Sequence, residues 1–342
     1  MKGRILLRHG HLSLLLSRRR LAWGLGLAVA VVLLALLVWP LGSHRTGLAE
    51  LAELLRDGGD ATARMVLLNL RLPRILLALL AGAMLGLAGA AMQALTRNGL
   101  ADPGLLGVKD GAALAVVALI LLAPSAPIGW RPVAGMAGGL AAAALVAVLA
   151  RSLSQLRLVL VGIGLSWFLS AGLAMALTLA EIRDVQAAMV WLAGSLNAAD
   201  WPAVRLAAVA ATIGALLLFA TVREADAAAL GDPLARALGV RLRRLAALRF
   251  AAPVALTAAC VSVAGGLGFV GLIAPHLARL TMGGGQSAHL TASALIGAAL
   301  VLAADSIGRL AFAPLQLPAG IVLALIGAPV LIALLWARRN QL

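Results

Sequence analysis

Charged side chains are scarce in this sequence. Asp, Glu, Lys and Arg make up 12% of the 342 residues and hydrophobic residues make up 63%, whereas an ordinary soluble domain carries about 25% charged residues. This composition excludes a sizeable water-soluble domain. The chain is therefore predicted to be an all-α, polytopic membrane protein surrounded by lipid.

Residues that carry covalent, redox or metal chemistry are also scarce. The single cysteine, Cys260, cannot form an internal disulfide, and the five histidines are scattered along the chain. The sequence has no Walker A motif, no zinc-ligand spacing and no serine nucleophile elbow. We therefore expect no catalytic residue, no metal and no cofactor in this chain, and the protein is not predicted to be an enzyme.

Basic residues, by contrast, are abundant, and the formal net charge is +15. They lie between apolar runs rather than along one surface, so they are expected to set membrane topology and not to bind nucleic acid. The basic segments at 18–20 and 338–339 are both expected on the cytoplasmic side, which requires an even number of crossings. Arginines between residues 45 and 74 break this bias and are expected on the outer side.

The apolar runs predict about ten transmembrane helices, because each crossing needs about 20 apolar residues. The predicted spans are 21–41, 72–95, 104–123, 132–150, 158–180, 202–221, 246–265, 268–281, 290–312 and 319–337. The stretch 187–195 is too short to cross and is predicted to be a surface or re-entrant helix. Residues 1–20 are predicted to form a basic cytoplasmic tail, and residues 21–342 a single transmembrane domain.

Ionisable residues are almost absent from the predicted spans. Asp305 is the best candidate for an ionisable residue inside a span, with Arg309 as its i, i+4 partner. Both lie toward the outer end of their span. An ion-gradient-driven secondary transporter is expected to carry ionisable groups in mid-membrane, so this class is the less favoured alternative. A structural membrane subunit of an enzyme complex is a second alternative, although no clustered His or Cys ligands support it. A transporter of this composition is expected to take its energy from a partner ATPase.

The longest predicted cytoplasmic loop spans about 223–245. Its centre is predicted to form a short helix with Asp232 as N-cap, Pro233 in the first turn and Gly239 as terminator. Composition alone leaves two interpretations open, which are a solvated connector and a docking helix for a cytoplasmic partner.

Several ordered motifs resemble the permease subunits of binding-protein-dependent ABC importers for iron siderophores, haem and vitamin B12. The motifs are RLPR (71–74), MQALTRNGLADPGLLG (92–107), WLAGSL (191–196), GFVGLIAPHLAR (268–279), AD (304–305), LPAGI (317–321) and IGAP (326–329). They cover the chain from about Arg71 to its C-terminal end. Two positions depart from the family pattern, since Gly99 stands where Pro is usual and Gln316 where Glu is usual.

The resemblance implies a type II ABC importer permease fold with ten helices in a bacterial cytoplasmic (inner) membrane, both termini being cytoplasmic. It also implies a second permease subunit, in a homodimer, and an extracytoplasmic solute-binding protein. Two cytoplasmic ATP-binding subunits would bind ATP and Mg. The cargo is then an iron chelate (siderophore), haem or cobalamin, and the sequence does not distinguish among them.

The resemblance also assigns roles to residues of this chain. Arg71, Arg74 and Arg309 match positions at which the family's outer mouth pairs with carboxylates of the binding protein. The ATPase coupling loop corresponds to Asp232, Pro233, Leu234, Ala235, Arg236, Ala237, Leu238, Gly239 and Val240. Ser154, Gln155 and Leu156 lie where the family places a cytoplasmic gate, although a plain connector fits them equally well.

Overall fold

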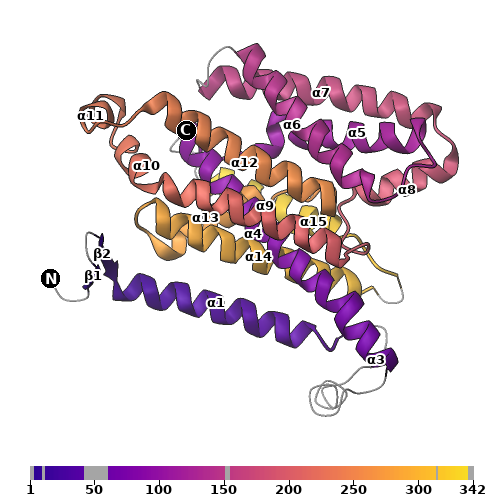
Figure 1. The fold of residues 1–342 in the computed structure, drawn as a ribbon, viewed down its shortest axis with the longest axis horizontal. Coiled ribbons are helices and arrows are strands. Elements are labelled where there is room, and N and C mark those ends of the chain that lie inside the picture. The colour runs from indigo at the N-terminus through magenta and orange to yellow at the C-terminus, as the bar shows by residue number, and fades with distance from the viewer. Residues whose placement is uncertain (1–3, 10–11, 42–60, 151–154, 313–314, 338–342) are drawn as a thin grey trace.

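The computed structural model describes residues 4–9, 12–41, 61–150, 155–312 and 315–337, which are almost entirely helical (Figure 1). The helices are α1 (Arg18–Val38), α3 (Ala61–Met65), η1 (Val66–Arg71), α4 (Leu72–Thr96), η2 (Pro103–Leu106), α5 (Val108–Leu122), α6 (Trp130–Ala150), α7 (Gln155–Leu179), α8 (Ile182–Leu192), α9 (Trp201–Ala220), α10 (Val222–Ala228), α11 (Asp232–Ala237), α12 (Leu242–Ala264), α13 (Val270–Met282), α14 (Gln286–Leu310) and α15 (Ala319–Ala337).

The described strands form one antiparallel hairpin before the first helix. It consists of β1 (Arg4–His9) and β2 (Leu12–Ser17). The predicted basic tail therefore contains local β-structure, and α1 begins at Arg18 rather than at Leu21.

The all-helical polytopic architecture is confirmed, with a helix at each of the ten predicted spans. Seven helical segments of the described chain are long and apolar enough to cross a membrane. Of the remaining three, α5 and α13 have 15 and 13 residues. They are short because the chain is non-helical immediately before each of them, at the turn after η2 and at residues 265–268. The short helix predicted near 187–195 corresponds to α8.

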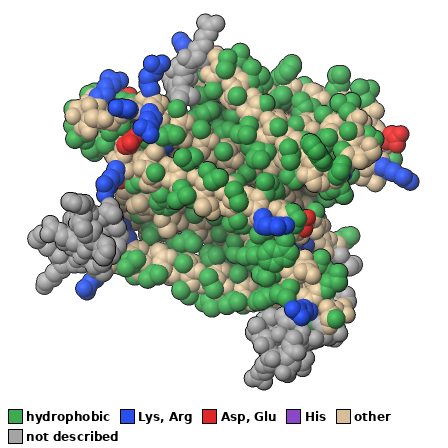
Figure 2. Space-filling view, in the orientation of Figure 1, with side chains coloured by type: hydrophobic (Ala, Val, Ile, Leu, Met, Phe, Trp, Pro, Cys, Tyr) green, Lys and Arg blue, Asp and Glu red, His purple; other side chains and the backbone are tan. Residues whose placement is uncertain are grey.

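The helices divide into a buried centre and a lipid-exposed periphery. The most apolar stretch of the rod formed by α3, η1 and α4 is 78% buried, whereas that of α1 is 11% buried. Large apolar side chains on α1, α7 and α15 point outward, and hydrophobic side chains are spread over the whole face drawn in Figure 2. In lipid this exposure needs no further partner, because the acyl chains solvate such surfaces.

Small residues allow α4 to lie against α13 and α14 at backbone contact. A Cβ atom added to Gly82 would lie 2.1 Å from the carbonyl oxygen of Gly297, and one added to Gly89 would lie 1.8 Å from that of Gly271. Glycine is the packing device that close helix approach in lipid requires.

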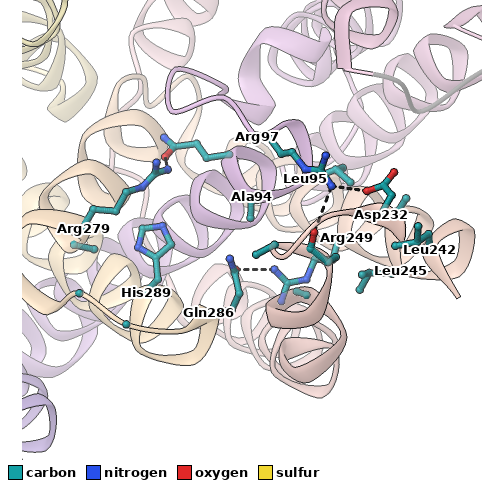
Figure 3. A pocket seen from close by; sticks show the side chains of 18 of the residues that line it. Ala94, Leu95, Arg97, Asp232, Leu242, Leu245, Arg249, Arg279, Gln286 and His289 are labelled. Atoms are coloured by element: carbon teal, nitrogen blue, oxygen red, sulfur yellow. Dashed lines mark hydrogen bonds and ion pairs between the residues drawn. The ribbon is translucent and has the colours of Figure 1, made fainter. Parts of the chain in front are cut away.

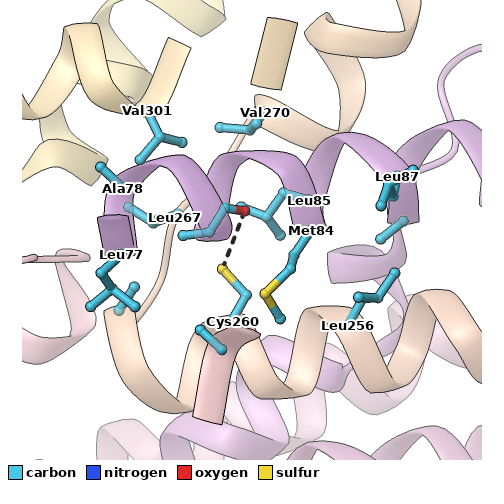
Figure 4. Close-up of a cluster of buried hydrophobic side chains, with 14 of the residues drawn as sticks. Leu77, Ala78, Met84, Leu85, Leu87, Leu256, Cys260, Leu267, Val270 and Val301 are labelled. Atoms are coloured by element: carbon cyan, nitrogen blue, oxygen red, sulfur yellow. Dashed lines mark hydrogen bonds between the residues drawn. The ribbon is translucent and has the colours of Figure 1, made fainter. Parts of the chain in front are cut away.

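The opposite face of α4 packs on α12. Met84 of α4 and Leu256 of α12 are both fully buried there, and the thiol of Cys260 lies 3.7 Å from the carbonyl oxygen of Ala81 (Figure 4). The four helices α4, α12, α13 and α14 therefore form one packed unit that positions both ends of the bundle.

Candidate functional site

Two ends of the helical unit carry polar side chains. At one end, called the arginine end, η1 ends at Arg71, Arg74 lies in the first turn of α4, and Asp305 and Arg309 lie in the last turns of α14. At the other, called the α11 end, α4 finishes beside α10, α11 and the first turns of α12 and α14. Because α4 and α14 run antiparallel through the centre, residues distant in sequence meet at both ends.

Arg74 and Asp305 form a bidentate ion pair at the arginine end. The Nε of Arg74 donates to Oδ2 of Asp305 at 2.9 Å, and its Nη2 donates to Oδ1 at 2.8 Å. The two side chains are 14% and 4% exposed. The Nη1 of Arg74 also donates to Oε1 of Gln316 at 3.1 Å, so the position that departs from the family pattern contributes a neutral acceptor here.

This geometry corrects the partner predicted for Asp305. Arg309, expected as its i, i+4 partner, instead donates from Nη1 to the carbonyl oxygen of Leu41 at 2.6 Å. The planar fork of Arg74 on the facing helix matches both carboxylate oxygens of Asp305 at once.

Arg71 is buried, with 8% of its surface exposed, and its Nη1 donates to the carbonyl oxygen of Pro40 at 2.7 Å. Together with Arg309 it therefore anchors the segment that follows α1. The structure brings the three predicted docking arginines to one end. Each of them also donates a hydrogen bond to another group of the same chain.

The predicted coupling loop forms two short helices, α10 and α11. The prediction that Asp232 is the N-cap is wrong, because Gly231 occupies that position and Asp232 lies in the first turn. The Oδ1 of Asp232 accepts instead from Nη2 of Arg97 at 2.5 Å. The same Nη2 donates to the carbonyl oxygen of Ala228 at 3.3 Å, so Arg97 of the α4 end contacts both short helices.

The predicted end of α11 at Gly239 is confirmed. Gly239 has a φ of +81°, its N–H donates to the carbonyl oxygen of Arg236, and the N–H of Val240 donates to that of Ala235. This pair of bonds is a Schellman motif. It leaves Leu234 and Leu238 47% and 61% exposed, so α11 presents apolar side chains away from the bundle.

The predicted gate is only partly described. Ser154 lies outside the described residues, and Gln155 and Leu156 form the start of α7.

A cavity of about 790 Å³ opens at the α11 end and was not predicted from the sequence (Figure 3). Its polar lining consists of Gln93, Arg97, Asp232, Arg249, Arg279, Gln286 and His289. Arg249 donates from Nη1 to Oε1 of Gln286 at 2.9 Å, and Arg279 donates to Oε1 of Gln93. The signal that could have indicated this cavity is the presence of Gln93 and Arg249 inside otherwise apolar spans.

Asp102 lies in the turn between α4 and η2 and caps η2. Its Oδ1 accepts from the N–H of Gly104 at 2.7 Å. Burial raises the pKa of this carboxyl above its usual value, against the opposing effects of the Gly104 bond and of Lys109. Asp102 is thus a partly buried ionisable group beside the start of α5 that the sequence pattern did not indicate.

Comparison with known proteins agrees with this architecture. The chain is 39% identical over 314 residues to the Fe(3+)-citrate import system permease protein YfmE of Bacillus subtilis, covering 90% of this chain and 93% of that protein. It is 40% identical over 266 residues to the Fe(3+) dicitrate transport system permease protein FecD of Escherichia coli, covering 77% and 83%. Other matching proteins are named as permeases for iron(3+)-hydroxamate, cobalamin and hemin.

A solved structure has the same fold. It is an inward-facing conformation of a metal-chelate type ABC transporter, with a TM-score of 0.83 and 28% identity, covering 92% of this chain and 98% of that chain. The sequence model of the FecCD transport family matches residues 27–337 of this chain. The chain therefore belongs to the FecCD transport family.

Proposed function

We propose that this chain is the membrane-spanning permease subunit of an ATP-driven importer that moves an iron chelate, haem or cobalamin. The observation that carries the proposal is the near full-length match to permeases of iron-citrate, hydroxamate, hemin and cobalamin import systems. The chain has no Walker A motif of its own, so ATP and Mg are assigned to two partner ATPase subunits. The ion-driven alternative has no support among these relatives.

The α11 segment is proposed to seat in the ATPase subunits. Its exposed Leu234 and Leu238 offer apolar surface, and the Arg97–Asp232 ion pair connects it to the central helix α4. Reversal of the exposed charge in Arg236→Glu should leave cargo-stimulated ATP hydrolysis poorly coupled to uptake. Equal coupling in vesicles carrying wild type and variant would overturn this assignment.

The arginine end is proposed to receive a solute-binding protein. Arg71, Arg74 and Arg309 gather there, and Asp305 pairs with Arg74. Three arginines at one end would favour steering of an acidic lobe more than they would add affinity. Arg309 and Arg74 are the residues proposed to meet the partner, and buried Arg71 is proposed to hold the surface in shape.

These assignments define the proposed orientation and assembly. The α11 end and both termini face the cytoplasm of a bacterium, the arginine end faces outward, and a second copy of the chain completes the permease. Residues 1–20 then form the cytoplasmic tail and the rest of the chain one transmembrane domain.

The cargo is tested by uptake into proteoliposomes that contain this chain, its ATPase and its binding protein. Ferric citrate, a ferric hydroxamate, haem and cobalamin are offered separately with ATP inside or outside the vesicle. We expect ATP-dependent accumulation of one of these classes and background levels of the others. Absence of accumulation for all four, with intact ATPase activity, would contradict the cargo proposal.

A further inference from the structure

The cavity at the α11 end carries more positive than negative side chains. Its lining includes Arg97, Arg249 and Arg279 together with His289, and the carboxylate of Asp232 is the acidic member. That carboxylate already accepts from Arg97. In Figure 3 the labelled polar side chains surround one common space, so positive potential is concentrated where a small anionic group would fit.

Arg249 is the deepest of these cations. It is 2% exposed, and its guanidinium donates to neutral acceptors, which are the amide oxygen of Gln286, the hydroxyl of Thr221 and the carbonyl oxygen of Leu218. Among the ion pairs of the described residues, none involves Arg249. A buried cation held by neutral oxygens pays a desolvation cost that a nearby anion offsets.

The nearby carboxylate of Asp226 does not fill this role by contact. Its Oδ1 accepts from the backbone N–H of Gln286 at 2.8 Å and so caps the start of α14. Asp226 forms no ion pair with Arg249 among the described residues and does not line the cavity, so the lining stays net positive.

The rest of the lining is apolar, and the cavity is larger than an inorganic anion needs. This apolar part of the lining consists of Ala94, Leu95, Ala225, Ala228, Ala229, Leu242, Leu245, Ala246, Ala278, Met282, Gly283 and Gly284. At about 790 Å³ the cavity falls within the range of about 300–1,000 Å³ typical of sites for organic ligands. A cavity lined by both arginines and apolar side chains matches a phosphodiester attached to a hydrocarbon chain.

The cavity also lies at the right depth for such a ligand. It is formed by the last turns of α4 and α13 and the first turns of α12 and α14, which is where membrane helices end. Basic pockets between the ends of membrane helices bind anionic lipid headgroups. We propose that this cavity binds the phosphate group of an anionic phospholipid, with Arg249 and Arg279 facing the phosphate and the leucine wall facing the glycerol and acyl chain.

Native mass spectrometry of the purified full-length chain in detergent tests the proposal. Phosphatidylglycerol and phosphatidylcholine of equal acyl length are titrated separately, and inorganic phosphate is titrated as a third probe. We expect phosphatidylglycerol to bind about tenfold more tightly than phosphatidylcholine, which corresponds to about 1.4 kcal/mol. Arg279→Gln should reduce this preference to about twofold or less, whereas Arg279→Lys, which keeps the charge, should retain most of it.

Arg243→Gln is the matched control, because Arg243 is an exposed arginine near the start of α12 and does not line the cavity. It should bind both lipids as wild type does. An equal preference in wild type and Arg279→Gln, or loss of preference in Arg243→Gln alone, would overturn the proposal. Tight binding of inorganic phosphate without preference for phosphatidylglycerol would support the phosphate chemistry and overturn the lipid as its source.

Discussion

The Nη2 of Arg97 lies 2.5 Å from Oδ1 of Asp232 and ties the end of α4 to α11. Arg97 holds a left-handed conformation, with a φ of +48°, immediately after the last turn of α4. At the far end of the same helix, Arg74 is bound to Asp305. One continuous buried helix therefore contacts both surfaces that are proposed to meet partner proteins.

Breaking the Arg97–Asp232 ion pair is expected to impair coupling more than stability. The two side chains are 53% and 48% exposed, and an exposed pair contributes less than about 1 kcal/mol to folding. We expect Asp232→Asn to raise the ATP hydrolysed per cargo transported by about fivefold, within the usual range of coupling free energies. The measurement is parallel ATPase and uptake assays in proteoliposomes.

The charge-swapped double variant Arg97→Asp with Asp232→Arg is the control for this prediction. It should restore part of the coupling, because the pair is re-formed with its polarity reversed. If Asp232→Asn couples as wild type does, the link between α4 and α11 has no role in transmission.

Loss of the carboxylate in Asp305→Asn should destabilise the fold. The variant leaves the guanidinium of Arg74 in a mostly buried site without its anion, and breaking a buried pair costs about 3 kcal/mol. Thermal unfolding in one detergent measures the effect. Gln316→Ala removes only the more exposed bond to Arg74 and should cost less than about 1 kcal/mol; comparable losses in the two variants would argue against a dominant ion pair.

Backbone contact between α4 and α14 predicts a sharp difference between two glycines. Gly82→Ala would place a methyl group 2.1 Å from the carbonyl oxygen of Gly297, so the helices must separate at a cost of about 2 kcal/mol. Gly164→Ala has open space around it and should stabilise α7 by about 0.5 kcal/mol through helix propensity. Unfolding midpoints that fall equally in both variants would contradict the close packing.

The raised pKa of Asp102 predicts a pH dependence of stability. Since burial raises the pKa of the folded carboxyl above its ordinary 3.8, the folded state binds the proton more tightly than the unfolded state. The stabilisation that this proton gives is present below the ordinary pKa and is lost as pH rises through the folded-state pKa.

Asp102→Asn keeps the acceptor for Gly104 and removes the charge. It should unfold at the same or a higher temperature than wild type at neutral pH, and the decrease in stability between acidic and neutral pH should be smaller. A lower midpoint at neutral pH with an unchanged pH slope would show that the ionised carboxylate is stabilising.

Much of the helical architecture could be predicted because apolar runs report directly on burial in lipid. The starts of α4 and α14 lie near charged or polar residues, and the break before α13 coincides with Gly265, Gly266 and Gly268. The end of α11 at Gly239 was predictable for a local reason as well, since a positive φ favours glycine.

Tertiary partners were not predictable from local spacing. Asp305 has an arginine four residues later, yet it binds Arg74, which is 231 residues away in sequence. Asp232 has the residue type of an N-cap, yet Arg97 binds its carboxylate. The cavity depends on how Gln93, Arg249 and Arg279 meet from three different helices. Polar residues inside apolar spans mark two of these positions, but their spacing in the sequence does not show that they meet.

Uptake of cargo into proteoliposomes tests the permease assignment most directly. Vesicles carry this chain with its ATPase and binding protein, and uptake is followed with ATP present or absent, and with ionophores that collapse proton and sodium gradients. We predict uptake that requires ATP and the ATPase subunits and that persists with the ionophores. Uptake by this chain alone, driven by an ion gradient and abolished by the ionophores, would contradict it.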